Sequence, residues 1–316
     1  MTTISKNQLF SIASFSVTIL FSVLLLILFT LTVSNDVAQY DLIFESITNS
    51  ESLWNAIINF RYEPGFTTIY YYLSFLDARV AFLLLGSASL TIKYIIFRKH
   101  LSIMIIPWFC YIVIFMPGLE SSQIRSALAS TVILYVVCTP NIRNNYISQG
   151  VAASLLHLVG VLIFAYQFVK KPFVTILLII LAALALNIFF QLLMNYFPVL
   201  YYYRANQLGG DINLFSTIFL SQLLISTCCI LNWRLFNFTQ KKGAFLIIIG
   251  TVLFISLSDF STVVHRVREV SMLGIFPLLF HQQLRLTLPS LTIYILFGYY
   301  LIYHFYFVSE ELFSYL

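Results

Sequence analysis

The sequence predicts an all-α, polytopic integral membrane protein that forms a single membrane domain over residues 1–316. Hydrophobic residues make up 60% of the chain and charged residues 9%, and the mean hydropathy is +0.92. Apolar runs long enough to cross a bilayer recur along the chain. This composition excludes an ordinary soluble domain. The net charge of +5 is scattered among apolar segments, which gives no indication of nucleic-acid binding.

Nine apolar runs are expected to be helices, since roughly 20 apolar residues span a bilayer. They cover residues 9–33, 79–97, 101–117, 124–139, 173–193, 214–233, 244–259, 270–284 and 288–308. The first is too long for a signal peptide and is expected to be retained. With the segment at 146–169, we expect about 10–11 transmembrane segments. Polar outer loops are expected at about 34–78 and 194–213, and the cysteines are expected to pack in apolar surroundings.

Residues 146–169 either cross the membrane once or form a hairpin of two short half-helices that returns near His157. The positive-inside rule favours the hairpin. With a cytoplasmic N-terminus and a returning hairpin, every lysine falls on the cytoplasmic side, and every carboxylate falls on the outer side or its membrane edge. A single crossing would move Lys170, Lys171, Lys241 and Lys242 outside. We therefore predict the hairpin, with the C-terminus on the outer face.

The arginines do not follow the lysines. Those expected on the outer side are Arg61, Arg79, Arg125, Arg204, Arg266 and Arg268. An arginine at the bilayer centre costs roughly 3 kcal/mol on insertion scales. Guanidinium groups are also better suited than ammonium groups to bidentate phosphate binding. The outer arginines therefore indicate an anionic partner.

Glu63 precedes Pro64, which suits the first position of a helix, so Glu63 is expected at the N-cap. Its carboxylate either caps that helix or lies at a cavity mouth, where it could accept a proton from a sugar hydroxyl. Arg125 is expected one turn into the helix that follows Pro117–Gly118. There it either binds a ligand or pairs with Glu120.

Histidine and arginine residues mark two further candidate segments. His157 at the hairpin tip is either a packed residue or a functional imidazole, because non-helical backbone inside a membrane needs protein or water beside it. Arg266 and Arg268 cannot share one helical face, so we expect an extended or turning segment that presents both, with His265 beside them. A solvated loop with an Arg–Glu pair is the alternative.

Aromatic residues gather in the second outer loop, where Tyr203 and Arg204 end a tyrosine run. Such a cluster is either part of an interface belt or a surface that stacks on sugars. Asp-x-Asp, a phosphate-binding lysine loop and His-Glu-x-x-His are all missing from the sequence. Neither a metal ion nor a cofactor is expected.

With these residues placed, the chain resembles the EpsG-like branch of the Wzy-type O-antigen and exopolysaccharide polymerases. Four short patterns carry the resemblance, and a late arginine element at Arg266 and Arg268 would complete it. The patterns are Asp36-x3-Tyr40, Glu63-Pro64-Gly65-Phe66, Ile124-Arg125-Ser126-Ala127-Leu128-Ala129 and Ala153-Ser154-Leu155-Leu156-His157. They extend over about residues 30–270. The family often has Arg-Gln where this chain has Arg125-Ser126.

The resemblance implies a membrane glycosyltransferase of GT-C-like architecture in the bacterial inner membrane, with its active site on the periplasmic face. Its substrates would be two undecaprenyl-diphosphate-linked oligosaccharides, and a chain-length regulator is a possible further partner. An acceptor hydroxyl would attack the anomeric carbon of the donor with inversion, and undecaprenyl diphosphate would leave without a metal ion.

The resemblance also implies roles for particular residues. Glu63 or His157 would orient and deprotonate the acceptor. The diphosphate would be bound by Arg125, Arg266, Arg268 and Arg61. Other substrate contacts would come from Asp36, Tyr40, Tyr203, Arg204 and His265.

Three other functions compete with polymerisation. An O-antigen ligase would use similar donors, and the Glu-Pro-Gly element favours the polymerase over it. A flippase for lipid-linked glycans would also need outward arginines, but no internal repeat is visible in the sequence. A membrane acyltransferase would use a cytoplasmic thioester, which fits poorly with candidates on the outer side.

Overall fold

A computed structural model describes residues 6–32, 37–59, 62–139, 145–169, six positions between 173 and 185, 215–257, 261–282, 284 and 286–314. Within these ranges the chain is helical and contains no strand, so the expected all-α class is shown for this part of the protein. Of the residues predicted to form a site, Asp36, Arg61, Tyr203 and Arg204 lie outside the described ranges. The expected loop at 194–213 and most of the expected span at 173–193 also lie outside them.

The first half of the chain starts with a long apolar helix, α1 (Lys6–Thr32). The polar segment after it folds into three short helices, α2 (Val37–Thr48), α3 (Leu53–Asn59) and α4 (Pro64–Tyr72). Then follow α5 (Ala78–His100), α6 (Ile105–Ile114) and α7 (Ile124–Cys138). The segment after α7 comprises α8 (Tyr146–Leu156) and the 3₁₀ helix η1 (Leu158–Phe168).

From residue 215 onward, the described part of the chain contains six helices of different lengths. They are α11 (Thr217–Leu231), η2 (Trp233–Leu235), α12 (Phe238–Ser256), α13 (Ser261–Met272), α14 (Ile275–Phe280) and α15 (Leu288–Ser314). Helix α12 begins with a capping box in which Asn237 and Gln240 satisfy each other's backbone N–H groups. The four cysteines are buried, as expected for packing residues.

Among the described residues, four helices are long and apolar enough to cross a membrane: α1 over Ala13–Leu31, α5, α12, and α15 over Leu288–Tyr306. Helices α6, α7 and α11 are apolar but have 10–17 residues, less than a bilayer usually requires. The expected continuous span at 270–284 is divided between α13 and α14. Gly274 lies at this break, where an added Cβ would come within 2.2 Å of the Gly243 carbonyl oxygen. These features are compatible with a polytopic membrane protein.

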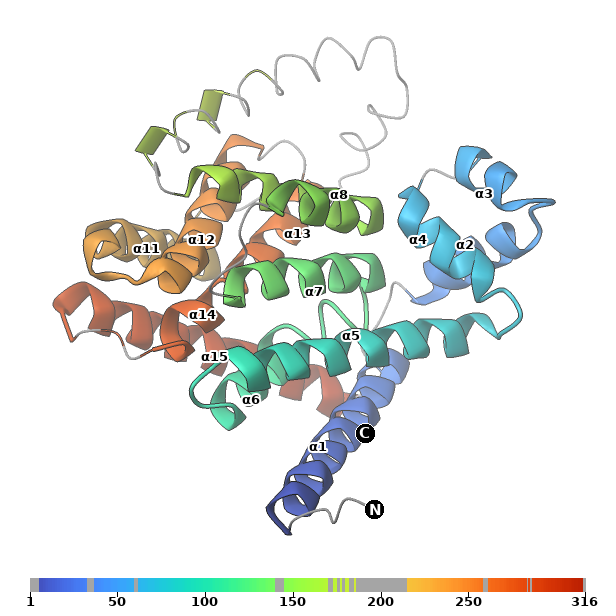
Figure 1. Cartoon of the computed structure of the whole chain (residues 1–316), viewed down its shortest axis with the longest axis horizontal. Helices are drawn as coiled ribbons and strands as arrows, with labels where there is room; N and C mark the ends of the chain where they lie inside the picture. Colours follow the sequence, from blue (N-terminus) through green and yellow to red (C-terminus); the bar gives the residue numbers. More distant parts are fainter. Residues whose placement is uncertain are drawn as a thin grey trace.

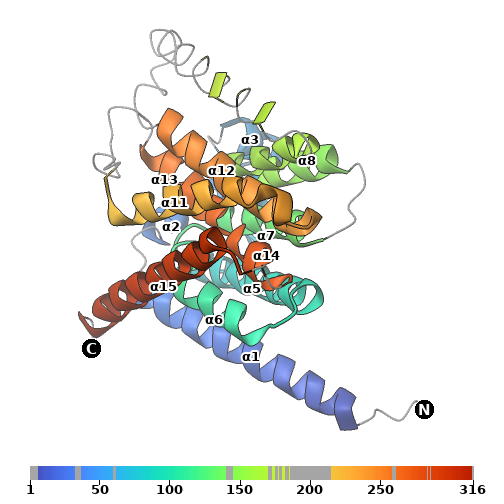
Figure 2. The same ribbon diagram turned by 90° about the vertical axis from the view of Figure 1, so that its left-hand side faces the viewer.

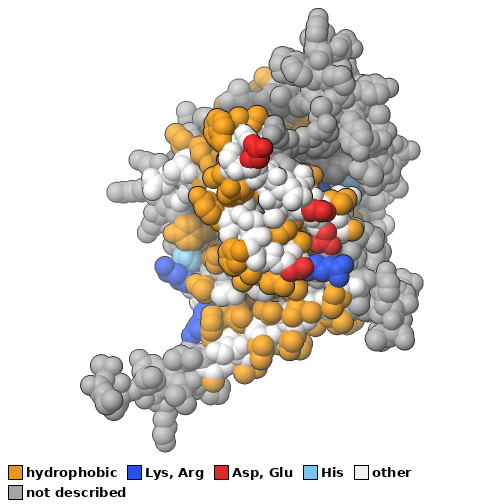
Figure 3. Space-filling model, turned by 90° about the vertical axis from the view of Figure 1, so that its right-hand side faces the viewer, with side chains coloured by type: hydrophobic (Ala, Val, Ile, Leu, Met, Phe, Trp, Pro, Cys, Tyr) orange, Lys and Arg blue, Asp and Glu red, His pale blue; other side chains and the backbone are white. Residues whose placement is uncertain are grey.

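Helix α7 lies at the centre of the molecule (Figures 1 and 2), with α5 packed on one side of it and α8 on another. Helices α1 and α15 lie on the side away from α8. Figure 3 looks onto the side that carries α2–α4, where acidic side chains and a few basic ones lie above a largely hydrophobic area. On α2, Asp41 pairs with Arg79 of α5 at 3.5 Å.

The predicted separation of lysines from carboxylates fails at one buried pair. Lys93 of α5 and Glu120, in the turn before α7, are both fully buried, and Lys93 Nζ lies 2.5 Å from Glu120 Oε1. They therefore cannot lie on opposite sides of the membrane. Lys242 is buried as well, and it donates to the Val136 carbonyl at 2.6 Å and the Thr139 carbonyl at 2.5 Å. It thereby supplies a cation to the C-terminal end of α7, which the helix dipole favours.

Candidate functional site

The site begins at the N-terminus of α4. Glu63 is the N-cap residue, with φ −61° and ψ 134°, and Pro64 takes the first helical position. The Glu63 side chain makes no capping hydrogen bond, so Glu63 is not a simple helix cap. Gly65 allows α4 to dock on the end of α8, because an added Cβ would lie 2.7 Å from the Leu155 carbonyl oxygen.

Arg125 binds the carboxylate of Glu63. Its Nη1 donates to Glu63 Oε2 at 2.8 Å, and the two side chains are 14% and 19% exposed. The guanidinium also lies over the Tyr62 ring, 4.5 Å from its centroid. Tyr40 of α2 is within hydrogen-bonding range of it. The alternative pairing of Arg125 with Glu120 is therefore wrong, since Glu120 pairs with Lys93.

His157 stands at the junction of α8 and η1, where the backbone becomes extended. Helices α8 and η1 pack against each other. The packing requires Gly160, where an added Cβ would lie 2.3 Å from the Ala153 carbonyl carbon. His157 is 7% exposed. Its Nδ1 accepts from the Val159 N–H at 3.2 Å, so in the neutral ring the proton resides on Nε2.

Arg266 of α13 reaches the other nitrogen of the same ring. Its Nη1 lies 3.5 Å from His157 Nε2. Arg125 and Arg266 both act electrostatically on His157, which places all three side chains in one cluster. The cluster is assembled from α4, α7, the α8–η1 junction and α13. We call these four residues, Glu63, Arg125, His157 and Arg266, the outer cluster, after the side of the membrane on which the sequence predicts them.

Arg268 does not join the outer cluster. Residues 261–272 form a helix, so the extended or turning segment expected there is wrong, and so is the solvated loop. Two residues along a helix point in different directions. Arg268 instead lies over the Phe254 ring, 5.7 Å from its centroid. Its charge interacts electrostatically with Tyr300 and His304 of α15.

His265 also lies on the Phe254 side of α13, with its ring 6.0 Å from that of Phe254. Burial, and then the charge of Arg268, lower the pKa of His265 below its ordinary value. It is therefore separate from the outer cluster. Within the described ranges, no group of three His, Cys, Asp or Glu side chains is arranged to hold a metal ion.

Tyr70 is a buried neighbour of the outer cluster that the sequence reasoning missed. It shares a helical face with Glu63 and Phe66, because these positions are spaced by three and four residues. Burial, and then Tyr40 and Asp41, raise the pKa of Tyr70 well above its usual value. Its hydroxyl is buried without a hydrogen-bond partner. The spacing of Glu63, Phe66 and Tyr70 was the available signal.

Compared with known proteins, the chain matches no family model, no curated protein and no solved structure. The resemblance to polysaccharide polymerases therefore depends on the short motifs and on their order and expected topology.

Proposed function

We propose that the protein is a lipid-linked oligosaccharide polymerase, which joins undecaprenyl-diphosphate-linked repeat units by inverting glycosyl transfer. The observation that carries this proposal is the convergence of Glu63, Arg125, His157 and Arg266 from four separate elements. Three of these positions belong to the motifs of the resemblance. A carboxylate beside a group of cationic and N–H donors suits a reaction that removes a proton and releases an anion.

His157 and Arg266 are suited to binding the departing diphosphate. Val159 donates to Nδ1, so the neutral ring presents Nε2–H as a donor. The Arg266 guanidinium 3.5 Å away is also a donor. An acceptor between these two donors would receive a hydrogen bond from each, and a diphosphate oxygen suits that position. Because its protonated nitrogen faces the cluster, His157 stabilises the anion in this proposal and does not act as the base.

Glu63 is then the base. Its carboxylate accepts the proton of the acceptor hydroxyl while that oxygen forms a bond to the anomeric carbon. The bond from that carbon to the diphosphate oxygen breaks, and its electron pair leaves with the diphosphate. Arg125 holds the carboxylate in position through the 2.8 Å contact. General base catalysis of this kind contributes about 10²–10⁴-fold in rate. In this scheme the enzyme works at the periplasmic face of the inner membrane.

A deletion strain tests the function directly through the glycans that it accumulates. Single-repeat lipid-linked material without polymer supports the polymerase. Polymer retained on undecaprenyl indicates a ligase, and repeat units held on the cytoplasmic face indicate a flippase. A normal ladder of chain lengths would contradict all three. Restoring the gene should restore the ladder, whereas a gene that carries Arg125→Ala should leave single-repeat material.

A further inference from the structure

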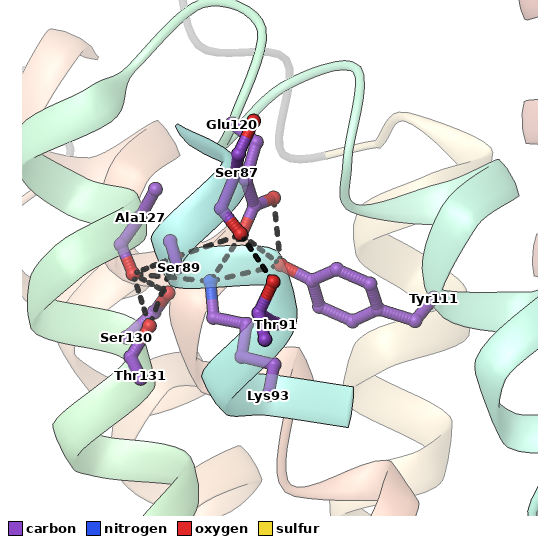
Figure 4. Close-up of polar contacts among 9 residues, drawn as sticks. All are labelled: Ser87, Ser89, Thr91, Lys93, Tyr111, Glu120, Ala127, Ser130 and Thr131. Atoms are coloured by element: carbon purple, nitrogen blue, oxygen red, sulfur yellow. Dashed lines mark hydrogen bonds and ion pairs between the residues drawn. The ribbon is translucent and has the colours of Figure 1, made fainter. Parts of the chain in front are cut away.

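Helix α7 is held at its first turn by a buried polar network (Figure 4). Glu120 precedes the first residue of α7 by four positions. Its carboxylate accepts hydrogen bonds from Lys93 at 2.5 Å, from the Tyr111 hydroxyl at 2.7 Å and from Ser89 at 3.1 Å. Lys93 also donates to the Ala127 carbonyl at 3.0 Å, two residues beyond Arg125. The network thus connects α5, α6 and the beginning of α7.

The network is closed. Lys93 has three N–H donors, and they are used by Glu120, Tyr111 and Ala127. Tyr111 accepts from Lys93 and donates to Glu120. Because no Lys93 donor is left for a ligand, the network is suited to holding the backbone and not to binding substrate.

The charges of Lys93 and Glu120 interact in opposite ways with the dipole of α7. A lysine beside the first turn of a helix meets the positive end of the helix dipole, which is unfavourable, whereas a carboxylate there is favoured. Glu120 therefore offsets the Lys93 charge at this place. A buried ion pair that loses one partner leaves an uncompensated charge, while replacing both partners by neutral groups is often tolerated.

We infer that Lys93 and Glu120 are positioning residues, an ionic lock that fixes the first turn of α7 and thereby the Arg125 guanidinium against Glu63. The lock extends the proposed function, on which its catalytic readout rests. It predicts an order among three variants. Glu120→Gln leaves a lysine charge at the wrong end of the dipole and is the most harmful. Lys93→Met leaves a carboxylate that the dipole and Tyr111 still stabilise. The double variant, Lys93→Met with Glu120→Gln, carries no uncompensated charge and recovers activity.

Polymer formation from the host's own lipid-linked repeat units, at matched amounts of folded protein, tests this order. We expect kcat to fall by roughly 10-fold or more in Glu120→Gln, with KM within about twofold, and to recover to within about threefold of wild type in the double variant. A purely structural pair would lower the yield of folded protein without changing kcat. Equal kcat values for Glu120→Gln and the double variant would overturn the lock.

A second readout does not need activity. In a cysteine-free background, Ser126→Cys places a fully buried thiol beside Arg125. A maleimide should label it faster in Glu120→Gln than in the parent or the double variant. Lys242→Met is the matched control, because it removes a buried lysine from the other end of α7. Labelling that rises equally with Lys242→Met, or not at all with Glu120→Gln, contradicts the inference. If the wild type makes no polymer, the proposed function fails while the labelling still tests the lock.

Discussion

Arg125 and Glu63 are 62 positions apart in the chain, yet their side chains meet at 2.8 Å. The contact joins the first turn of α7 to the N-terminus of α4. The Arg125 guanidinium is therefore already paired with a carboxylate in this structure. This contact fixes the direction of the carboxylate that we propose as the base.

The pair makes a prediction about conservative changes. Glu63→Gln keeps the size of the side chain but removes the proton acceptor, and should lower kcat by about 10²–10⁴-fold. Arg125→Lys keeps the charge but loses the fixed guanidinium geometry, so it should lower kcat less than Arg125→Ala does. Polymer ladders at matched protein levels measure both. A Glu63→Gln enzyme with normal turnover would remove Glu63 as the base.

His157 offers a test that separates a donor from a base. A glutamine amide can donate from near the position of Nε2, so His157→Gln should retain more activity than His157→Ala, by roughly 10-fold or more. Neither side chain could replace a basic imidazole. Similar losses in the two variants, measured as kcat with single-repeat acceptors, would therefore favour the base role instead.

Arg266 and Arg268 form a matched pair on one helix. Arg266 faces His157, whereas Arg268 lies over Phe254. Arg266→Ala should lower kcat by about 10²–10³-fold, the usual cost of removing one donor that stabilises an anion. Arg268→Ala should lower it by less than about 10-fold. The comparison requires both variants to unfold at the same temperature, and a reversed order would refute the placement of the diphosphate.

The packing of η1 on α8 depends on Gly160, and a substitution at Gly298 provides the control. Gly160→Ala would place a Cβ 2.3 Å from the Ala153 carbonyl carbon, so η1 must separate from α8. We expect a loss of folded protein in size-exclusion chromatography. At Gly298 of α15 an added Cβ meets nothing within 4 Å, so Gly298→Ala should fold as well as the wild type. Equal yields from the two variants would show that the hairpin does not need this contact.

His265 predicts a dependence of stability on pH. Burial and Arg268 lower its pKa, so the unfolded chain binds a proton more readily than the folded chain. Its contribution is unchanged above about pH 6.5 and becomes destabilising as the pH falls below that value. Thermal unfolding between about pH 8 and 5 should therefore show a smaller decrease for His265→Gln than for the wild type. A steeper decrease in the variant would contradict the expected destabilisation by His265 at low pH.

Local patterns in the sequence predicted much of the helical framework. The apolar run at 124–139 corresponds to α7, and Pro64 marks the beginning of α4 as expected. The run at 270–284 misled, because apolar composition does not reveal the break at Gly274, where two backbones touch. Likewise, the periodicity of charges could not show that α13 is helical through both arginines.

Composition and the long continuous apolar runs by themselves predicted an apolar, helical membrane chain, since such runs satisfy their backbone polar groups inside a bilayer as helices. The partners of its charges were decided by the tertiary structure. Lys93 could pair with Glu120, and Arg125 with Glu63, only after packing had brought distant helices within a few ångströms. Electrostatic pairing depends on distance and burial, which neighbouring positions in a sequence do not specify.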